Sequence, residues 1–248
     1  MATKSSSQYP SNEELGAPAV PHELLDTQLS RHQLQLGVFD IDGTLRTAKD
    51  PWIHLHNHLG FAKEAQLHKE QFFSGQIAYE EWVAKDARLW KGFHRSEILR
   101  ALDTNPLKEG ADTLLGWFKA NRIPIIGIST GLDVFNEGVA QQFGFLFIKS
   151  NELLFDASGV CTGEAKINVR EDAKGKVLGA ILEELSIPRE GVVAFGDGTA
   201  DIQLFKIAAL SVAISPSKAQ IREAATHCLE NCSLSEAVSH LKAHFAIA

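Results

Sequence analysis

The chain of 248 residues is long enough for one well-packed core, or a core with a small lid, but too short for two large independent domains. Its composition, 44% hydrophobic and 22% charged, is ordinary for a globular protein and excludes a disordered or collagen-like chain. The net charge of -7 provides no positive field that would attract nucleic acid. We therefore expect no nucleic-acid partner.

The sequence also sets expectations about location. No apolar run approaches the roughly 20 residues that span a bilayer, and the N-terminus lacks a secretory pattern. The three cysteines form no CxxC pair, which is typical of a reducing compartment. We expect a cytoplasmic protein with no membrane partner, and the sequence does not indicate its oligomeric state. Residues 1–33, which begin with many Ser and Pro, are predicted to be a mobile N-terminal extension.

Four short apolar runs end in polar loops, which is typical of buried strands. They lie at residues 36–39, 123–128, 192–195 and 210–214. Three segments with a helical spacing of apolar residues alternate with these runs, at 134–142, 174–185 and 200–208. The alternation predicts an α/β fold, a Rossmann-like three-layer core around a parallel sheet. Ligands of such sheets bind outside the carboxyl ends of the strands, where these polar loops meet.

Two segments interrupt the alternation. Between residues 46 and 106 there is no strand pattern, and four helical patterns occur at 52–59, 64–73, 79–90 and 96–102. We therefore expect a small helical cap domain, 47–106, inserted after the first strand of a core domain made of 34–46 and 107–248. Two short apolar pieces between Leu153 and Gly163 flank a turn sequence and predict a β-hairpin.

Asp40 and Asp42 come directly after the first predicted strand, and Gly43 makes a tight turn possible there. One carboxylate of such a pair can attack phosphorus to form an aspartyl-phosphate. The other can protonate the leaving alcohol and later activate water. Taken alone, the pair fits a solvated turn or a helix cap equally well.

Asp197 and Asp201 follow the third predicted strand and lie four residues apart, where the next helix begins. Mg²⁺ binds to oxygen ligands, commonly one or two carboxylates together with phosphate oxygens and water. The two aspartates could therefore hold Mg²⁺. They could equally cap the helix and interact with its dipole.

The second predicted strand ends at Ser129, Thr130 and Gly131, whose hydroxyl and backbone N–H groups could hold phosphate oxygens. Lys174 stands at a predicted helix start, where a lysine is electrostatically unfavourable unless an anion lies nearby. Helix capping and a solvated lysine are the alternatives. Together, however, the four groups supply the nucleophile, cation ligands and donors that phosphoryl transfer requires.

These residues resemble the motifs of the haloacid dehalogenase-like superfamily of phosphatases. The string Phe39-Asp40-Ile41-Asp42-Gly43-Thr44-Leu45 matches its first motif in full. Ser129 resembles the second motif and Lys174 the third, and Gly196-Asp197-Gly198 with Asp201 resembles the fourth. The helical insertion is similar to the C1 cap of the phosphoserine phosphatase branch.

The resemblance implies a role for each matched residue. Asp40 would be the nucleophile and a Mg²⁺ ligand, and Asp42 the general acid and base, which also binds the metal through its backbone carbonyl. Asp197 would bind Mg²⁺ directly, with Asp201 supporting it. The phosphoryl oxygens would be held by Ser129, Lys174 and the N–H groups around Thr130 and Gly131. The expected function is Mg²⁺-dependent hydrolysis of a small phosphomonoester, with a small phosphorylated metabolite as the partner.

The predicted cap departs from the phosphoserine phosphatase pattern at two positions. Lys49 aligns with a glutamate that binds the substrate amine in that branch, and Asp86 aligns with an arginine that binds its carboxylate. Phosphoserine is therefore not the expected substrate. His54, His56 and His58 remain open as packing residues, metal ligands or substrate contacts. Two further functions stay open, a phosphotransferase or mutase that uses the same intermediate and a catalytically silent binding protein.

Overall fold

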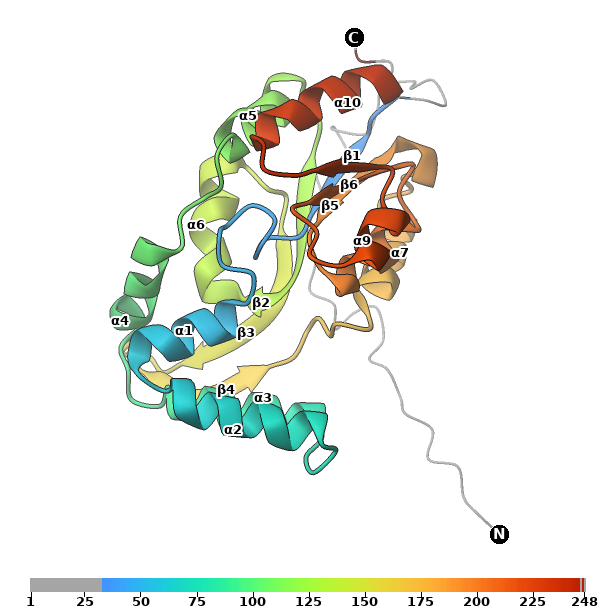
Figure 1. Cartoon of the computed structure of the whole chain (residues 1–248). Helices are drawn as coiled ribbons and strands as arrows, with labels where there is room; N and C mark the ends of the chain where they lie inside the picture. The colour runs from blue at the N-terminus through green and yellow to red at the C-terminus, as the bar shows by residue number, and fades with distance from the viewer. Residues whose placement is uncertain (1–32, 246, 248) are drawn as a thin grey trace.

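The computed structural model describes residues 33–245 and 247. The predicted N-terminal extension, 1–33, therefore lies outside the described residues except for Gln33. The described chain forms a seven-stranded sheet in the order β4-β3-β2-β1-β5-β6-β7 (Figure 1). Its strands are β1 Leu36–Phe39, β2 Ile125–Leu132, β3 Ile148–Phe155, β4 Cys161–Lys166, β5 Val192–Gly196, β6 Leu210–Ile214 and β7 His227–Leu229.

All neighbouring strands are parallel except β3 and β4, which pair antiparallel. β3 and β4 are the predicted hairpin, closed by the turn at residues 156–159. The four predicted strands are present, although β2 runs on through Ser129 and Thr130 to Leu132 with a register irregularity after Ile128. The expected α/β fold with a largely parallel sheet is confirmed.

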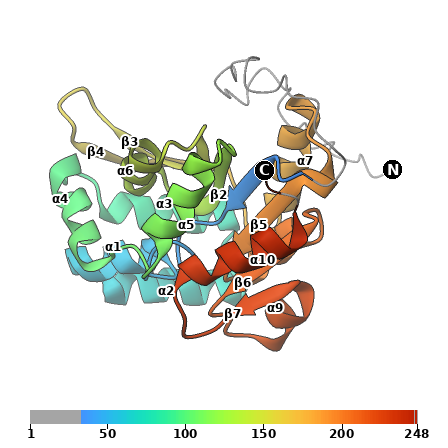
Figure 2. The same ribbon diagram turned by 90° about the horizontal axis from the view of Figure 1, so that it is seen from above.

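Helices cover both faces of the sheet, which makes the predicted three layers (Figure 2). One face packs against α5 Ala111–Ala120, α6 Asp133–Phe143 and α10 Ala237–His244. The other face packs against α7 Lys174–Glu184, α8 Ile202–Phe205 and α9 Ala219–Ala224. The helix expected at 200–208 is shorter, because a 3₁₀ turn at Thr199–Asp201 precedes α8. The Asp201 carboxylate accepts hydrogen bonds from the backbone N–H groups of Asp197 and Gly198, which tightens this turn.

β1 is the central strand, and all four of its residues are buried. Phe39 stacks on Phe195 of β5, with ring centroids 4.5 Å apart, and meets the edge of Phe118 from α5 at 5.5 Å. Gly37 allows this contact, because a Cβ atom there would lie 2.7 Å from Phe118 Cε1. The aromatic cluster thus fixes β1 against its neighbour and against the helix above it.

The segment after β1 is helical, with α1 Pro51–Leu59, α2 Ala62–Phe73, α3 Tyr79–Leu89, α4 Arg95–Leu99 and a 3₁₀ turn at Arg100–Thr104. α1 begins where Asp50 caps the backbone N–H groups of Trp52 and Ile53, and it ends at Gly60, which has a left-handed backbone. Figure 1 shows α1, α2 and α3 beyond the ends of β2 and β3. A separate apolar cluster, which includes Leu55, Trp90 and Phe135, joins these helices to α6 and the hairpin. None of the described helices is long and apolar enough to cross a membrane.

We expect the substitution Phe118→Ala to lower the free energy of unfolding by about 3–5 kcal/mol, because it removes a fully buried ring and leaves a cavity beside β1. Urea denaturation followed by circular dichroism measures the change. Phe73→Ala is the matched control, since Phe73 is 71% exposed, and we expect it to change stability by less than about 0.5 kcal/mol. Equal losses in both variants would contradict this description of the core.

Candidate active site

The predicted site residues converge at the carboxyl end of β1. β1 connects onward to β2 on one side, whereas β5, on its other side, connects onward to β6. Open sheets bind ligands in the crevice where such connections diverge. A cavity of about 230 Å³ opens at this position. Six of the predicted residues line it, Asp40, Asp42, Thr130, Lys174, Asp197 and Asp201.

Asp40 is held by two side chains. Lys174, the first residue of α7, donates to Asp40 Oδ1 at 2.7 Å. Thr44 donates from its hydroxyl to Asp40 Oδ2 at 2.9 Å and lies 3.3 Å from Asp197 Oδ1. Both Asp40 and Lys174 are buried, so the orientation of the carboxylate is fixed.

Asp197 and Asp201 lie beside this pair. Lys174 also donates to Asp201 Oδ1 at 2.6 Å, and the other oxygen of Asp201 accepts the two backbone N–H groups that tighten the turn after β5. Asp40, Asp197 and Asp201 each place one carboxylate oxygen within 4.8 Å of the others. A cluster of three buried aspartates is therefore present where the sequence predicted metal ligands.

Asp42 lies on the other side of Asp40, next to the end of β2. Ser129 donates from its hydroxyl to Asp42 Oδ2 at 3.1 Å. Asp42 Oδ1 is buried and has no hydrogen-bond partner among the described residues. Gly131 permits this packing, because a Cβ atom there would lie 2.3 Å from Asp42 Oδ2. The structure therefore brings Asp42 and Ser129 together, as expected.

Burial and the closeness of these carboxylates shift their pKa values. Burial raises the pKa of Asp42 to about 7, and the neighbouring Asp40 adds to the rise. Burial also raises the pKa of Asp40, although Lys174 opposes the shift, and burial and Asp201 raise the pKa of Asp197. Burial alone would lower the pKa of Lys174, but Asp201 and Asp40 raise it above its usual range, so this lysine stays protonated.

Thr130 and Gly131 are engaged within the protein. The backbone carbonyl of Thr130 accepts hydrogen bonds from Trp52 Nε1 at 3.2 Å and Asn151 Nδ2 at 2.9 Å, which ties α1 to β2. The backbone N–H of Gly131 donates to the Ser129 hydroxyl at 2.8 Å. The predicted use of these backbone N–H groups for phosphate remains a prediction.

The sequence analysis gave Thr44, Lys108 and Lys49 no place beside the aspartates, although it aligned Lys49 with a substrate-binding position of the cap. Thr44 belongs to the first motif, and its position in that string was the available signal. Lys108 donates to the carbonyl of Gly43 and, like Lys49, approaches the cluster as a cation. Lys49 Nζ lies 3.7 Å from Asp197 Oδ2 and donates to the carbonyl of Ser215 at 3.2 Å. Neither lysine lies in a motif that would indicate its position beside the aspartate cluster.

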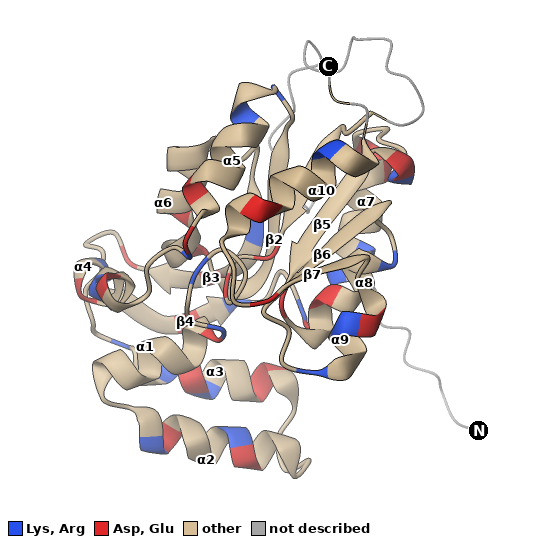
Figure 3. Cartoon of the chain, turned by 45° about the horizontal axis from the view of Figure 1, so that its top comes forward, with Lys and Arg blue, Asp and Glu red and all other residues tan. Residues whose placement is uncertain are grey.

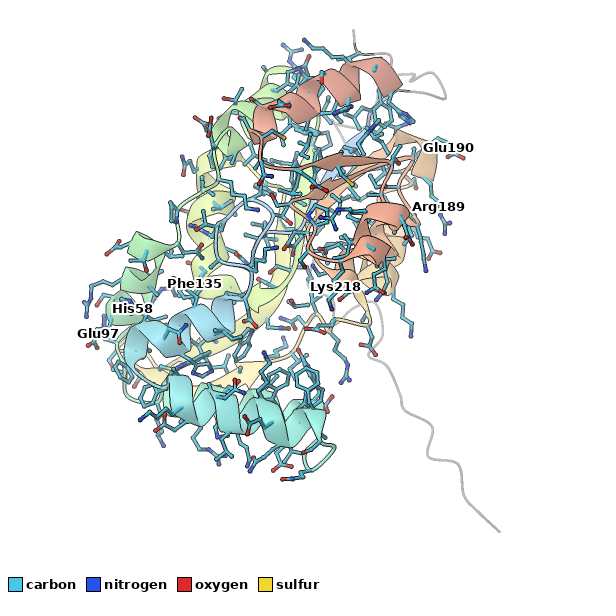
Figure 4. All side chains as sticks on the ribbon, in the orientation of Figure 1. His58, Glu97, Phe135, Arg189, Glu190 and Lys218 are labelled. Atoms are coloured by element: carbon cyan, nitrogen blue, oxygen red, sulfur yellow. The ribbon has the colours of Figure 1, made fainter. Side chains whose placement is uncertain are left out.

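The three histidines of α1 occupy different environments. His54 Nε2 lies 2.7 Å from the carbonyl oxygen of Ala101, and buried His56 accepts a hydrogen bond from Trp90 Nε1 at 3.2 Å. His58 is exposed near the outer end of α1, where Figure 4 labels it. Among the described residues, the three aspartates of the strand-end cluster are the only group of three or more His, Cys, Asp or Glu side chains that could hold a metal, and no histidine belongs to it.

The donor set fits a divalent cation. Four aspartates, Asp40, Asp42, Asp197 and Asp201, are buried together with the single buried ammonium group of Lys174. Burial and mutual repulsion raise the pKa values of three of these carboxylates, and a bound cation would relieve that repulsion. Carboxylate oxygens are the ligands that Mg²⁺ prefers.

Comparisons with known proteins agree with this geometry. Residues 129–241 match the family model described as haloacid dehalogenase-like hydrolase. The phosphoserine phosphatase of Methanocaldococcus jannaschii is 27% identical over 84% of this chain and 98% of its own length. A solved structure, the phospho-aspartyl intermediate analogue of phosphoserine phosphatase, is 26% identical with a TM-score of 0.70 and covers 84% of this chain and 99% of its own. These comparisons support the resemblance to the haloacid dehalogenase-like superfamily that the motifs indicated.

Further relatives support this family. The phosphoserine phosphatase of Streptomyces coelicolor is 27% identical over 92% of this chain and 55% of its own length. A probable phosphoserine phosphatase from Vibrio cholerae shares the fold, with a TM-score of 0.76 and 21% identity over 87% of this chain and 66% of its own. The resemblance read from the motifs, and the hydrolase class that it implied, are confirmed for this haloacid dehalogenase-like protein.

We expect Lys174→Met to destabilise the protein by about 3–5 kcal/mol, because it leaves the buried carboxylates of Asp40 and Asp201 without their shared ammonium group. The free energy of unfolding in urea, measured without divalent cations, reports the loss. Lys242→Met is the control, since Lys242 is exposed on α10 and its replacement should have little effect. A Lys174→Met protein as stable as the control would show that the buried ion pairs contribute nothing to folding.

Proposed function

We propose that the chain is a Mg²⁺-dependent phosphatase that hydrolyses a small phosphomonoester through an aspartyl-phosphate on Asp40. The observation that carries this proposal is the arrangement around one buried carboxylate. Asp40 has Lys174 at 2.7 Å, Asp42 two residues along the chain, and Asp197 and Asp201 within reach of a shared cation. Nucleophile, proton donor, positive charge and metal ligands are thus supplied in one crevice.

In the first step, the carboxylate of Asp40 forms a bond to phosphorus while the bond from phosphorus to the leaving oxygen breaks. Asp42 donates its proton to that oxygen, so the product leaves as an alcohol. A pKa of about 7 for Asp42, raised by burial, suits a group that must be protonated near neutral pH. Lys174 keeps its charge beside the transferring group and holds Asp40 in line.

In the second step, Asp42 acts as a carboxylate and takes a proton from water, whose oxygen attacks phosphorus. The bond between phosphorus and Asp40 breaks, which releases phosphate and restores the nucleophile. Ser129 orients Asp42 through its hydrogen bond, and its hydroxyl lies at the end of β2 where phosphoryl oxygens would be held. The same residue therefore serves both the proton donor and the phosphate.

Asp40, Asp197, Asp201 and the backbone carbonyl of Asp42 would hold the cation, with Asp201 supporting the site through Lys174 and the turn after β5. When bound, Mg²⁺ would neutralise negative charge on the carboxylates and on the phosphoryl oxygens. The helices at 47–106 would act as the cap that limits the entry of water and substrate. Arg170, from the segment before α7, pairs with Glu80 and lies over the Tyr79 ring, both in α3. These contacts connect the helices to the core and support their role as a cap.

We expect Asp40→Asn to lower kcat for a phosphomonoester such as p-nitrophenyl phosphate by about 10³-fold or more, because the amide cannot act as the nucleophile. Release of inorganic phosphate measures the rate, and removal of Mg²⁺ by EDTA should abolish the activity of the wild-type protein until Mg²⁺ is restored. Asp112→Asn, an exposed position of α5, is the matched control and should retain full activity. Near-normal hydrolysis by a folded Asp40→Asn protein would refute the assignment of the nucleophile.

A further inference from the structure

A second and larger cavity, of about 710 Å³, lies among α1, α2 and α3. It shares the lining residues Lys49, Pro51, Thr130 and Glu171 with the crevice that contains Asp40. The two spaces therefore adjoin, and a phosphate ester held at Asp40 would extend its leaving group into the larger one. The residues that line this larger cavity would therefore determine which leaving groups can bind.

One face of α3 forms a wall of the cavity. Tyr79, Trp82, Val83 and Asp86 all line it, and their spacing of i, i+3, i+4 and i+7 places them on one side of the helix. Trp52 of α1 adds a further aromatic ring. Aromatic faces attract cations, and the Arg170 guanidinium already lies 4.9 Å from the centroid of Tyr79.

Asp86 is the buried acid of this wall, with 4% of its surface exposed. His68 of α2 lies 2.7 Å from Asp86 Oδ1, and His56 Nε2 of α1 lies 3.4 Å from Oδ2 without the geometry of a hydrogen bond. Trp90 donates to His56 Nδ1, so this nitrogen acts as an acceptor and Nε2 is the ring nitrogen that faces Asp86. Histidine rings are thus the side chains that pair with this carboxylate, and among the described residues neither Lys nor Arg does so.

The other charges of the cavity lie closer to water. The outer surfaces of α2 and α3 carry both signs (Figure 3), and the three lysines that line the cavity, Lys49, Lys63 and Lys69, are not buried. Lys49 is directed toward the phosphate end, where it lies near Asp197 and Ser215. Solvent screens exposed charges much more than buried ones, so Asp86 dominates the field inside the cavity.

We propose that this cavity binds a cationic leaving group, so that the substrate is the phosphate ester of an amino or quaternary ammonium alcohol that carries no carboxylate. The proposal rests on the function proposed above and adds the substrate class. The ammonium group lies against Asp86 and the aromatic wall, where it compensates a buried negative charge. A carboxylate on the same carbon as the ammonium would face Asp86 without a buried cation to pair with, which disfavours phosphoserine.

A purely structural role for Asp86 makes a different prediction. Its contacts with His56 and His68 join α1, α2 and α3, so any substitution there could loosen the cap. Loosening would affect all substrates alike, whereas a role in recognition changes the ratio between a charged substrate and its neutral isostere. The ratio of kcat/KM for a charged substrate to kcat/KM for its neutral isostere is therefore the quantity to measure.

The test compares phosphocholine with 3,3-dimethylbutyl phosphate, which has the same shape but no positive charge, and phosphoethanolamine with L-phosphoserine. For the wild-type protein with Mg²⁺, we expect kcat/KM to favour phosphocholine over its neutral isostere by about tenfold or more. We expect phosphoethanolamine to be hydrolysed faster than phosphoserine. In Asp86→Asn the ratio of kcat/KM for phosphocholine to that for the isostere should fall to about one. Glu81→Gln removes one charge from an exposed position of the same helix and should preserve the ratio.

The outcomes separate the two proposals. Hydrolysis of the neutral ester with no preference for the cation in the wild-type protein would overturn the substrate class and leave the phosphatase intact. A preference for phosphoserine over phosphoethanolamine would overturn it as well, and so would a ratio that Asp86→Asn leaves unchanged. Failure to release phosphate from any of the esters would instead count against the phosphatase itself. The wild-type comparison decides the matter even if Asp86→Asn does not fold.

Discussion

Lys174 lies between the carboxylates of Asp40 and Asp201 at 2.7 and 2.6 Å, and all three side chains are buried. Burying charges is costly unless they are paired, so this lysine determines how four aspartates can lie together at the end of one strand. The turn after β5 and the start of α7 are both arranged around it. The same contacts that make the folded chain possible also orient the proposed nucleophile.

The carboxylates outnumber the ammonium group, and the raised pKa values of Asp40, Asp42 and Asp197 express that imbalance. In the proposed enzyme the excess charge has two uses. A cation can be held by Asp40 and Asp197, and Asp42 can keep its proton until the leaving oxygen needs it. The repulsion among these buried carboxylates would thus favour both a bound cation and a protonated Asp42.

Much of this site could be predicted from the sequence because its residues follow apolar runs. The run that ends at Phe39 and the run that ends at Phe195 have the profile of buried strands, and parallel strands bring their carboxyl ends together. Lys108 and Lys49 could not be predicted in this way, because they reach the site from loops whose paths depend on tertiary packing. Asp86 illustrates the same limit, since its partners His56 and His68 come from two other helices whose relative placement no local pattern encodes.

In the proposed enzyme, the core and the helical insertion would have different tasks. Residues at the strand ends would act on the phosphoryl group and treat many esters alike, whereas the cavity among α1, α2 and α3 would contact the part of the substrate that varies. Lys218, labelled in Figure 4, is the residue before α9. It lines the smaller cavity on the side opposite the helical insertion. Selectivity should therefore change through the helices, while the chemical steps depend on Asp40 and its neighbours.

The proposed mechanism depends above all on a covalent bond between phosphorus and Asp40. Acid quenching of the protein during turnover, followed by proteolysis and mass spectrometry, would detect that intermediate directly. We expect one phosphoryl group on the peptide that contains Asp40, located on this residue and lost when substrate is exhausted. Phosphorylation of a different residue during rapid turnover would contradict the account.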